Sequence, residues 1–465
     1  MHSNRAADDA IAIWQAGVDA VDSEQLVARQ LTLHDGLLTC GNVSLNLNDV
    51  GRIFVVGAGK AGAGMAAGVE AALGAALLDD KNVTGWVNVP DNCVRALSRI
   101  HLHPARPAAR NEPTSAGVAG AQRIYELVRG AEANDLVICL LSGGGSALLP
   151  MPAAGITWQD KLAVTRFLSA AGADIRQLNT VRKQLSAIKG GGLARACRAG
   201  HLLTLIISDV IGDPLDVIES GPTVPNPTTA QDALDVLGSF GDDRSEIPQP
   251  VHHHLSRQAS LSSVDDNTPL STSCVIDNIV LGNNDTAVAA AADEATRRGY
   301  HVERLETQHD EGMAEEVGRR LLDYARKLNP TSPICILSGG EPTVRLVDEV
   351  QRGRGGRNQQ LVLSVVAAAY RSAAEVATLA NPWWQGMTLL SGGTDGEDGP
   401  TDAAGAMMTE AIVRAALSQN LDPQPYLERN DAYSFFQQLD ALLITGPTHT
   451  NVCDVRVMIV KPANS

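Results

Sequence analysis

The sequence predicts an α/β protein with two doubly wound, mostly parallel-sheet domains. Short apolar runs, typical of buried strands, alternate with helical segments along most of the 465 residues. Several of these runs end abruptly in glycine, as strands do where they turn into the next helix of such a fold. The 43 glycines and an aromatic content of only 3% favour close-packed α/β units over an aromatic-rich β-sandwich.

The first half of the chain begins with a predicted amphipathic helix over residues 5–30, in which apolar residues recur on one face. Buried strands are predicted after it, some of them running into turns, at 52–56, 83–89, 135–145 and 202–214. Helices are predicted between or after these strands, at 62–73, 117–130 and 159–172, and a further helix is predicted to end at residues 190–192.

Residues 238–273 are rich in Ser, Asp, Pro and His and show little periodicity, which indicates a domain junction. The alternation of strands and helices restarts after this segment. Strands are predicted at 274–283, 301–307, 333–340, 387–393 and 440–448, and helices at 285–299, 311–328 and 358–370. We therefore expect two α/β domains, residues 1–240 and 241–465, that face each other across an interdomain cleft.

The net charge of −16 makes nucleic acids and anionic membranes poor partners for this chain. An anionic substrate would need a local cluster of Lys, Arg and backbone N–H groups. The seven cysteines are scattered without a CxxC pair, which suits a reducing compartment. No signal peptide is recognisable, and no apolar run approaches the roughly 18 residues of a membrane span, so we expect a cytoplasmic protein.

The turn "SGG" occurs three times, in LLSGGGS (140–146), ILSGGE (336–341) and LLSGGTD (389–395). Glycine after a strand allows positive φ and lets successive backbone N–H groups point at an anion. The need for tight βα turns would explain a single SGG, but three with Ser at the same place favour ligand binding. The candidate binding residues here are Ser142, Gly143, Gly144, Gly145, Ser146, Ser338, Gly339, Gly340, Glu341, Gly392, Gly393 and Thr394.

GAGKAG (57–62) follows a strand and formally matches the dinucleotide fingerprint, which makes Gly57 and Gly59 candidate binding residues. The fingerprint also requires an acid at the end of the second strand. Asp79 and Asp80 precede that strand, and Asp91 lies beyond it. Lys60 is more natural for holding a phosphate or a carboxylate than for binding NAD. Because no GxxxxGK[ST] motif occurs, a P-loop kinase is disfavoured.

A basic segment, LNTVRKQLSAIKGGGLARAC (178–197), contains Lys183 and Lys189 on what we expect to be a helix ending at Gly190. In so acidic a chain this block favours anion binding, although a solvated basic helix face would explain it equally well. Asn179 resembles an N-cap, which by itself would account for its polarity. Asn179, Lys183 and Lys189 are candidate binding residues.

Two acidic turns are candidates for a metal site. Asp209 follows an apolar strand, and Asp395 lies in SGGTDGEDGPTD. Carboxylates on glycine turns near phosphate-binding loops suit Mg²⁺, which takes one or two carboxylates plus phosphate oxygens. A solvated acidic loop is the alternative. Arg357, in GRGGRNQQ, is placed to stabilise a transferring phosphoryl group, and Asn358 is a candidate helix cap and binding residue.

Taken in order, these segments make the chain resemble the type-2 glycerate kinases, which carry a C-terminal leucine-rich-fragment (MOFRL) domain. The resemblance extends from about residue 52 to residue 454. It is carried by VVGAGKAGAGMA, LLSGGGSALL, LNTVRKQLSAIKGGGLA, ISDVIGDP with SGPTVPNPTT, LSGGEPTV, GRGGRNQQ, SGGTDGEDGPTDAAGA and ITGPTHTNVCD.

The resemblance implies an N-terminal Rossmann-like glycerate kinase domain and a MOFRL-type C-terminal domain. It implies ATP-dependent phosphorylation of D-glycerate, with 2-phosphoglycerate as the usual product and a divalent metal as cofactor. Lys60 and Arg357 would be the main catalytic cations in the cleft. Asp209 and Asp395 are alternatives both as Mg²⁺ ligands and as acceptors of the substrate hydroxyl proton, so Asp209 is also a candidate catalytic residue.

Three departures from the family pattern bear on the substrate. The segment around His103 differs from the usual Gly-His-Pro-like sequence, His449 stands where Gly is usual, and Glu219 replaces a small residue. The rival activities are a nicotinamide-dependent hydroxypyruvate reductase and a non-catalytic metabolite-binding regulator. The hydroxyl that is phosphorylated and the choice between a monomer and a homodimer stay open.

Overall fold

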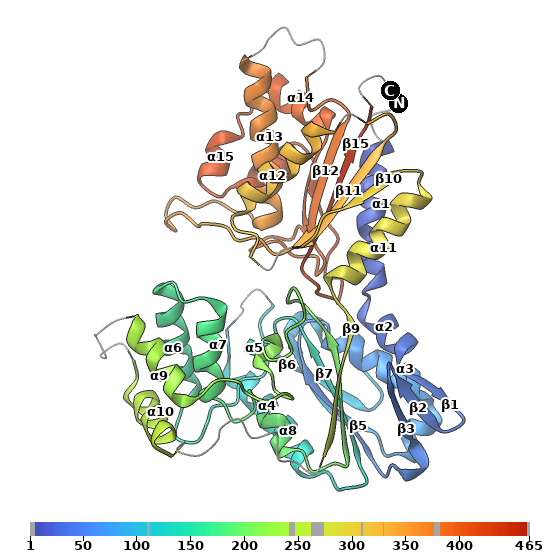
Figure 1. Ribbon diagram of the computed structural model, residues 1–465, viewed down its shortest axis with the longest axis vertical. Coiled ribbons are helices and arrows are strands. Elements are labelled where there is room, and N and C mark those ends of the chain that lie inside the picture. Colours follow the sequence, from blue (N-terminus) through green and yellow to red (C-terminus); the bar gives the residue numbers. More distant parts are fainter. Residues whose placement is uncertain are drawn as a thin grey trace. The chain divides into compact units, whose positions relative to one another are not determined.

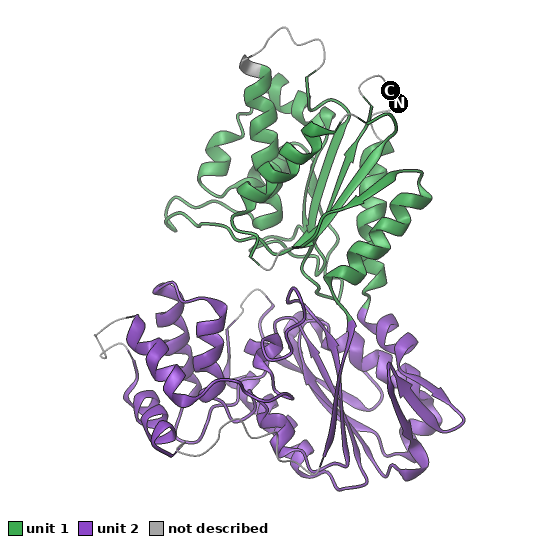
Figure 2. Cartoon of the chain, viewed as in Figure 1, with its two compact units in different colours: residues 1–22, 282–465 green, residues 23–281 purple. Residues whose placement is uncertain are grey.

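The computed structural model describes residues 5–108, 112–240, 247–261, 274–307, 310–328, 330–375 and 382–462 (Figure 1). They form two compact units, coloured separately in Figure 2. Unit 1 comprises Met1–Asp22 and Gly282–Ser465, and unit 2 comprises Ser23–Leu281. The expected boundary at residue 240 differs from this division, because it falls inside unit 2.

Unit 2 is built on a six-stranded sheet with the strand order β6-β5-β4-β7-β8-β9. The pairs β4–β5, β5–β6, β4–β7 and β7–β8 are all parallel. The strands are β4 (Ile53–Ala58), β5 (Thr84–Pro90), β6 (Ile100–Arg106), β7 (Leu136–Ser142), β8 (His201–Ile207) and β9 (Val275–Gly282). Every residue of β4 and β7 is buried, as expected of parallel strands covered on both faces.

Helices and one small sheet complete unit 2. A three-stranded antiparallel sheet, which the sequence did not predict, precedes β4 and consists of β1 (Thr32–His34), β2 (Leu37–Cys40) and β3 (Val43–Asn46). The α-helices are α2 (Ser23–Gln30), α3 (Gly62–Asp80), α4 (Ser115–Arg129), α5 (Gly145–Leu148), α6 (Trp158–Ala170), α7 (Ile175–Gln184), α8 (Gly192–Ala196), α9 (Ala230–Ser239) and α10 (Gln249–Leu261). The 3-10 turns are η1 (Leu47–Asp49), η2 (Asp91–Cys93) and η3 (Ile218–Ser220).

Helices α6, α7, α9 and α10 pack around a separate hydrophobic core that includes Val164, Val181 and Leu237. Figure 1 shows these helices grouped beside the sheet of unit 2. The helix α10 lies within 238–273, which was expected to be a junction without periodic structure. Only part of that segment belongs to the described residues.

Unit 1 contains a mixed sheet with the strand order β10-β11-β15-β12-β13-β14. Its strands are β10 (His301–Arg304), β11 (Ile334–Gly340), β12 (Met387–Gly393), β13 (Gly405–Met408), β14 (Leu442–Leu443) and β15 (Asp454–Val460). The α/β class is confirmed, and β10, β11, β12 and β14 share one direction. However, β13 and β15 run against their neighbours, so this sheet is less parallel than expected.

The departure from a parallel sheet arises from β15, a strand that was missed. The run DVRVMIV follows a loop rather than a helix, so it lacks the alternation on which the prediction rested. An antiparallel strand needs no helical crossover, and β15 inserts between β11 and β12 in this way. The predicted strand at 440–448 is shorter than expected, since β14 has only two residues.

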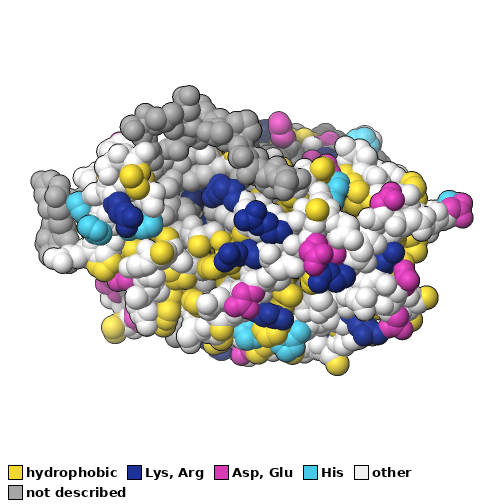
Figure 3. Space-filling view, turned by 90° about the horizontal axis from the view of Figure 1, so that it is seen from below, with side chains coloured by type: hydrophobic (Ala, Val, Ile, Leu, Met, Phe, Trp, Pro, Cys, Tyr) yellow, Lys and Arg dark blue, Asp and Glu magenta, His cyan; other side chains and the backbone are white. Residues whose placement is uncertain are grey.

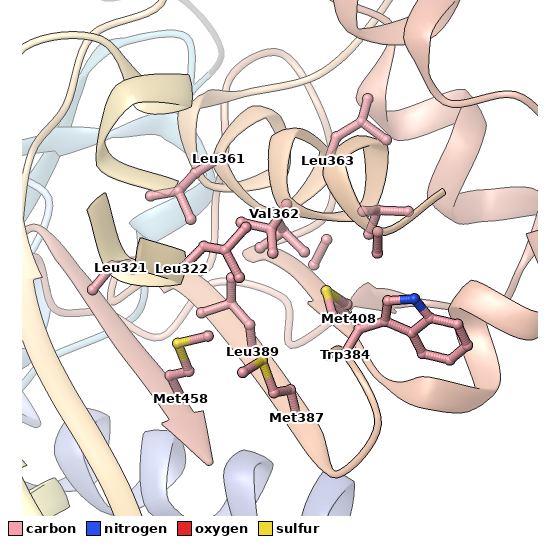
Figure 4. Packing of buried hydrophobic residues seen from close by; sticks show 14 of the residues in the cluster. Leu321, Leu322, Leu361, Val362, Leu363, Trp384, Met387, Leu389, Met408 and Met458 are labelled. Atoms are coloured by element: carbon pink, nitrogen blue, oxygen red, sulfur yellow. The ribbon is translucent and has the colours of Figure 1, made fainter. Parts of the chain in front are cut away.

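Helices cover both faces of the sheet in unit 1. In Figure 1, α1 (Arg5–Ala20) and α11 (Asn284–Arg297) lie on one side of it, and α12 (Ala314–Lys327) and α13 (Arg357–Glu375) lie on the other. Figure 4 shows Leu322, Val362 and Leu389 meeting in the core between the sheet and α13. The remaining helices are α14 (Glu410–Ser418), α15 (Gln424–Glu428) and α16 (Ala432–Gln438).

The helix α1 belongs to unit 1 although it begins the described chain. Its Trp14 is fully buried and donates a hydrogen bond from Nε1 to Gly392 O at 3.1 Å. Gly17 lets α1 approach α11 closely, because a Cβ at this position would lie 2.8 Å from Ala287 O. The predicted helix over residues 5–30 is therefore two helices, α1 and α2, that belong to different units. Within the described residues, no helix is long and apolar enough to cross a membrane.

Candidate active site

The GAGKAG turn connects β4 to α3, but its backbone donors are already used inside unit 2. Gly59 N donates to Asn88 O at 3.1 Å, and Lys60 N donates to Gly143 O at 2.9 Å. Ala61 N donates to the Ser142 hydroxyl at 3.1 Å, and Gly62 N donates to Gly59 O at 3.2 Å. A pyrophosphate bound in the dinucleotide manner needs such N–H groups. This turn therefore does not offer the donors that the fingerprint requires.

The neighbouring SGGGS turn, at the end of β7, differs in that most of its backbone N–H donors are not used by other groups of the described residues. Within the described residues, the N–H groups of Gly143, Gly144, Gly145 and Ser146 have no hydrogen-bond acceptor. Gly144 has a φ of +79°, a left-handed conformation that glycine adopts without strain. Successive N–H groups on such a turn form a concave donor site for an anion. The unpaired N–H groups make this turn available for an anion, and its binding of a ligand stays a prediction.

Two cations lie against the SGGGS turn. The space that a Cβ on Gly144 would occupy is 3.5 Å from Lys60 Cγ and 3.2 Å from Arg106 Nη2. Arg106, at the end of β6, is only 3% exposed, whereas Lys60 is half-buried. The sequence pointed to Lys60 but not to Arg106, since Arg106 lies outside any glycine motif.

Glu219 occupies the other side of this turn, and its Oε1 accepts a hydrogen bond from Ser142 N at 2.9 Å. Burial raises the pKa of Glu219 well above its usual value; the Ser142 N–H group and Lys189 oppose this rise, and Asp209 adds to it. Glu219 has a φ of +50°. It begins three consecutive left-handed residues, a strained arrangement of the kind that is concentrated at functional sites.

His449, another of the three departures from the family pattern, also has a left-handed backbone, with a φ of +59°. Glycine adopts that conformation without a steric penalty, which is consistent with the expected glycine at this position. The ring of His103 lies 5.1 Å from that of Trp86, and His103 Nε2 lies 2.9 Å from Ala116 O. Ring packing and this polar contact are sufficient to explain the position of His103.

The candidate residues of the basic segment converge on Ser220. Asn179 accepts a hydrogen bond from the Ser220 hydroxyl at 3.0 Å. Lys189 Nζ donates to Ser146 O at 2.9 Å and also contacts the Ser146 and Ser220 hydroxyls. Lys183, by contrast, forms an ion pair with Asp216, with Nζ 3.0 Å from Oδ2. Lys189 therefore lies against the SGGGS turn, whereas Lys183 has an acidic partner of its own.

Two expectations about the basic segment are wrong. Asn179 lies inside α7 and is not its N-cap, because the Asp174 side chain accepts from Gln177 N and caps the helix. The helix ends at Gln184 rather than at Gly190. The buried position of Asn179, facing Ser220, explains its polarity instead.

Lys161 on α6 is a further basic residue of this region, and the sequence analysis missed it. It is 7% exposed, and its Nζ has no hydrogen-bond partner within the described residues. Burial and the nearby charge of Arg182 lower the pKa of Lys161 to about 7. Its position was detectable in the sequence, since Lys161 shares one buried helix face with Val164 and Leu168.

In unit 1, the other two SGG turns lie on either side of Asp454, the first residue of β15. The sheet register places Asp454 opposite Gly340 on one neighbour and opposite Gly393 on the other. Arg357 donates to Asp454 from Nε at 2.7 Å and from Nη2 at 3.0 Å, and it donates to Glu341 from Nη1 at 2.8 Å. The structure thus brings Arg357, Glu341 and both turns together around Asp454, an acid that was not among the predicted site residues.

The glycines of these two turns also have a packing role. A Cβ on Gly339 would lie 1.5 Å from Asn284 Oδ1, and one on Gly340 would lie 1.8 Å from Glu311 Oε2. Gly392 is similarly close to Trp14, at 2.9 Å from its Nε1. Close packing is therefore sufficient to explain these glycines, and their predicted contact with a ligand stays a prediction.

The remaining candidates of unit 1 stabilise the loops around Arg357. Asn358 does not cap α13 with its side chain; the carboxylate of Asp398 accepts from the backbone N–H groups of Asn358 and Gln359 at 3.0 and 2.9 Å. Burial raises the pKa of Asp398 to about 6, although these two hydrogen bonds oppose the rise. Ser391 donates to Asn358 Oδ1, and Thr394 donates to Cys453 O at 2.7 Å. The hydroxyl of the remaining Ser338 has no partner within the described residues.

The predicted Mg²⁺ ligands, Asp209 and Asp395, lie in different units. Within the described part of the chain, no three His, Cys, Asp or Glu residues are grouped as a metal site. Mg²⁺ needs only one or two protein carboxylates when phosphate oxygens complete its shell. A Cβ on Gly393 would lie 3.1 Å from Asp395 Oδ1 and 3.6 Å from Asp454 Oδ1. Two carboxylates therefore flank this turn, and the donor set around Asp395 fits Mg²⁺ bound together with a phosphate.

Surface charge gives no sign of a polyanion-binding face on the side of the molecule drawn in Figure 3. Lys and Arg side chains on that face are interspersed with Asp and Glu side chains rather than gathered into one continuous patch. The cations that distinguish this acidic chain are those around the SGGGS turn. They suit a small anion better than a long one.

Comparisons with known proteins agree with the predicted family. Residues 9–256 match the family "Domain of unknown function (DUF4147)", and residues 334–454 match the MOFRL family. A human protein named glycerate kinase is 35% identical, with 98% of this chain and 93% of the human protein covered. A protein from Agrobacterium vitis named putative hydroxypyruvate reductase is 38% identical, with 88% and 87% covered. The crystal structure of glycerate kinase from Thermotoga maritima superposes with a TM-score of 0.78 at 30% identity, with 97% of this chain and 99% of that chain covered.

Proposed function

The chain belongs to the type-2 glycerate kinase family and is a kinase that phosphorylates glycerate, and from this premise we propose that ATP is the phosphoryl donor and 2-phosphoglycerate the product. We further propose that the substrate is D-glycerate. The related proteins named glycerate kinase support the reaction class, and the anion-binding groups of the site support the transfer of a phosphoryl group.

The observation that carries the proposal is the contrast between the two glycine turns of unit 2. The N–H groups from Gly143 to Ser146 have no acceptor within the described residues, and Lys60, Arg106 and Lys189 lie next to this turn. Preorganised N–H groups and cations of this kind stabilise the negative charge on a transferring phosphoryl group. In our proposal, this turn and Lys60 hold the phosphoryl oxygens.

Arg357 is the second cation of the proposed mechanism. Desolvation lowers the pKa of Arg357, but the carboxylates of Asp454 and Glu341 raise it well above the usual value, so the guanidinium stays charged. Such chemistry depends mainly on positioning and electrostatics, and Arg357 would neutralise charge that develops in the transition state. A reaction that uses both Lys60 and Arg357 requires both units to act on one substrate, and this stays a prediction.

Mg²⁺ is the proposed cofactor, held by Asp209 or Asp395. When bound, it would neutralise phosphate charge. The same two carboxylates are alternative acceptors for the proton that the substrate hydroxyl loses. Both residues come two positions after the end of a strand, Asp209 after β8 and Asp395 after β12, and ligands of α/β sheets bind at such strand ends.

Hydroxypyruvate reduction is the alternative function, supported by the printed name of the Agrobacterium vitis relative. A nicotinamide cofactor would need the donors of the GAGKAG turn, and those N–H groups already have partners from Gly59 to Gly62. The structure of the turn therefore weighs against this alternative.

A single purified preparation tests the two activities. It is incubated with ATP, Mg²⁺ and D-glycerate while ADP release is measured, and in parallel with hydroxypyruvate while NADH and NADPH oxidation is measured. We expect ADP release alone, and phosphorus NMR of the product should identify 2-phosphoglycerate. Formation of 3-phosphoglycerate would refute the product assignment, and nicotinamide oxidation without ADP release would refute the kinase mechanism.

A further inference from the structure

Lys161 carries a buried amino group whose Nζ has no hydrogen-bond partner within the described residues. It projects from the face of α6 that also carries Val164 and Leu168, and both of those residues belong to a hydrophobic core. An apolar residue would be expected at this position of the helix. Burying a charge that has no partner is costly, so such residues are seldom retained for stability. The position points to a ligand that supplies the missing negative charge.

Two further cations add positive charge near Lys161, so an anionic ligand would be more favourable there. Arg182 on α7 and Lys189 both repel Lys161 electrostatically, and this repulsion helps to lower the pKa of Lys161 and Lys189 below their usual values, with burial as the main cause. Within the described residues, the side chain of Arg182, a residue of α7, has no hydrogen-bond or ion-pair partner. Glu219 is the one carboxylate whose charge favours protonated Lys189, and burial raises the pKa of Glu219, which weakens this compensation.

Short neutral groups lie beside Lys189. Lys189 Nζ contacts the hydroxyls of Ser146 and Ser220, and Ser220 in turn donates to Asn179. Hydroxyl and amide groups of this kind suit the hydroxyl groups of a small polyol acid. Ser146 belongs to both parts of the site, because its N–H group lies on the open turn and its side chain contacts Lys189.

We infer that Lys161, Arg182 and Lys189 form the pocket that receives the carboxylate of the acceptor substrate. This inference rests on the proposed function, in which the open turn holds the phosphoryl group. A three-carbon acid carries its carboxylate within a few bonds of the reacting hydroxyl, so its two anionic ends need adjacent binding groups. Ser146 connects the pocket to the turn and thus provides this adjacency. The pocket would select hydroxy acids over uncharged polyols.

The test is the variant Lys161→Met in the full-length chain, with Arg166→Met as the matched control. Arg166 lies on the same helix but is exposed and pairs with Glu112, so its replacement removes one positive charge away from the pocket. We expect Lys161→Met to raise the KM for D-glycerate by about tenfold or more, with the KM for ATP changed less than about twofold. The melting temperature should stay the same or rise, because the variant removes a buried charge. The control should leave both KM values unchanged.

Other outcomes overturn the inference. A raised KM for ATP with an unchanged KM for glycerate would mean that these cations bind the nucleotide. Unchanged values for both substrates would mean that Lys161 contacts neither, and a fall in melting temperature that fully accounts for lost activity would indicate a structural role.

Calorimetric titration of D-glycerate without ATP separates this inference from the proposed function. If the wild-type chain fails to phosphorylate glycerate but binds it, and Lys161→Met weakens that binding, then the proposed function fails and the pocket stands. If the wild-type chain neither binds nor phosphorylates glycerate, both fail.

Discussion

Arg357 donates hydrogen bonds from Nε and Nη2 to the two carboxylate oxygens of Asp454, at 2.7 and 3.0 Å. The Asp454 side chain is fully buried, whereas that of Arg357 is 31% exposed. A bidentate pair of this kind fixes the plane of the guanidinium as well as its position. Asp454 therefore serves to orient Arg357. Both residues lie where β15 begins, between the two SGG turns that end β11 and β12.

Replacing Arg357 by Lys should lower kcat far more than it changes the KM for ATP. A lysine cannot reproduce the two parallel hydrogen bonds to Asp454, so the cation would lose its orientation although its charge is kept. We expect kcat to fall by about a hundredfold, the usual effect of removing one group that stabilises a transition state. Steady-state kinetics measures this, with the exposed Arg371→Lys on the same helix as control. Near-normal turnover of Arg357→Lys would refute the catalytic role.

Lys60→Ala should remove activity while leaving the fold intact. The side chain of Lys60 is half-buried beside the open turn, and its backbone N–H bond to Gly143 O survives the substitution. We expect kcat to fall by about a hundredfold or more, with a loss of less than about 1 kcal/mol in the free energy of unfolding. Kinetics and urea unfolding should be measured on the same preparation. Arg123→Ala, on the exposed surface of α4, is the control, and Lys60→Ala with normal turnover would exclude Lys60 from the mechanism.

Asp395→Asn should weaken the response of the kinase to Mg²⁺. The carboxylate of Asp395 lies on a glycine turn next to Asp454, and an amide is a poorer ligand for a hard cation. We expect the Mg²⁺ concentration for half-maximal activity to rise by about tenfold, with the stability of the protein little changed. A titration of activity against Mg²⁺ at fixed ATP checks this. An unchanged titration would eliminate Asp395 as a ligand and leave Asp209 as the alternative.

Glu219 should make the stability of the protein depend on pH. Its folded-state pKa is raised above the usual 4.5, so the folded chain binds this proton more tightly than the unfolded chain. The contribution to stability is therefore fully present below about pH 4.5 and is lost as the pH rises towards the raised pKa. Relative to Glu219→Gln, the wild type should lose up to about 1.4 kcal/mol per pH unit in that interval. Urea unfolding of both proteins at several pH values measures the difference, and parallel pH profiles would contradict the prediction.

Lys161 should make glycerate binding weaken in mildly alkaline solution. Its pKa is lowered to about 7, mainly by burial and partly by Arg182, so it loses its charge as the pH rises above that value. Arg182 is the charged group that acts on Lys161, and Lys161 itself acts on Lys189, which is also influenced by Arg182, Lys183 and Glu219. The KM for D-glycerate should be constant below about pH 7 and rise by up to about tenfold per pH unit above it. Lys161→Met should lack this rise, and a wild-type KM that is flat from about pH 6 to 9 would count against a charged Lys161 in the bound state.

Local sequence patterns predicted the strands and helices of this chain well where each element carries its own signal. The runs at 83–89 and 387–393 are strands at almost the predicted residues, and the helices at 117–130 and 358–370 are present. Patterns failed where an element depends on distant partners. The strand β15 has no helix before it, and α1 packs on a sheet formed by residues more than 280 positions away.

The sequence by itself determined the α/β class, the family and the position of the glycine turns, because strand periodicity, glycine and motif order are all local properties. Only the tertiary structure decided which turn keeps backbone N–H groups available for a ligand. GAGKAG and SGGGS look alike as sequences, yet the donors of the first are used by Asn88, Ser142 and Gly143, whereas those of the second lack acceptors within the described residues. It also decided that Asp454 orients Arg357 and that Lys161 is a buried cation. Hydrogen bonds and desolvation depend on which groups are in contact in the folded chain. These contacts are between residues that are far apart in the sequence.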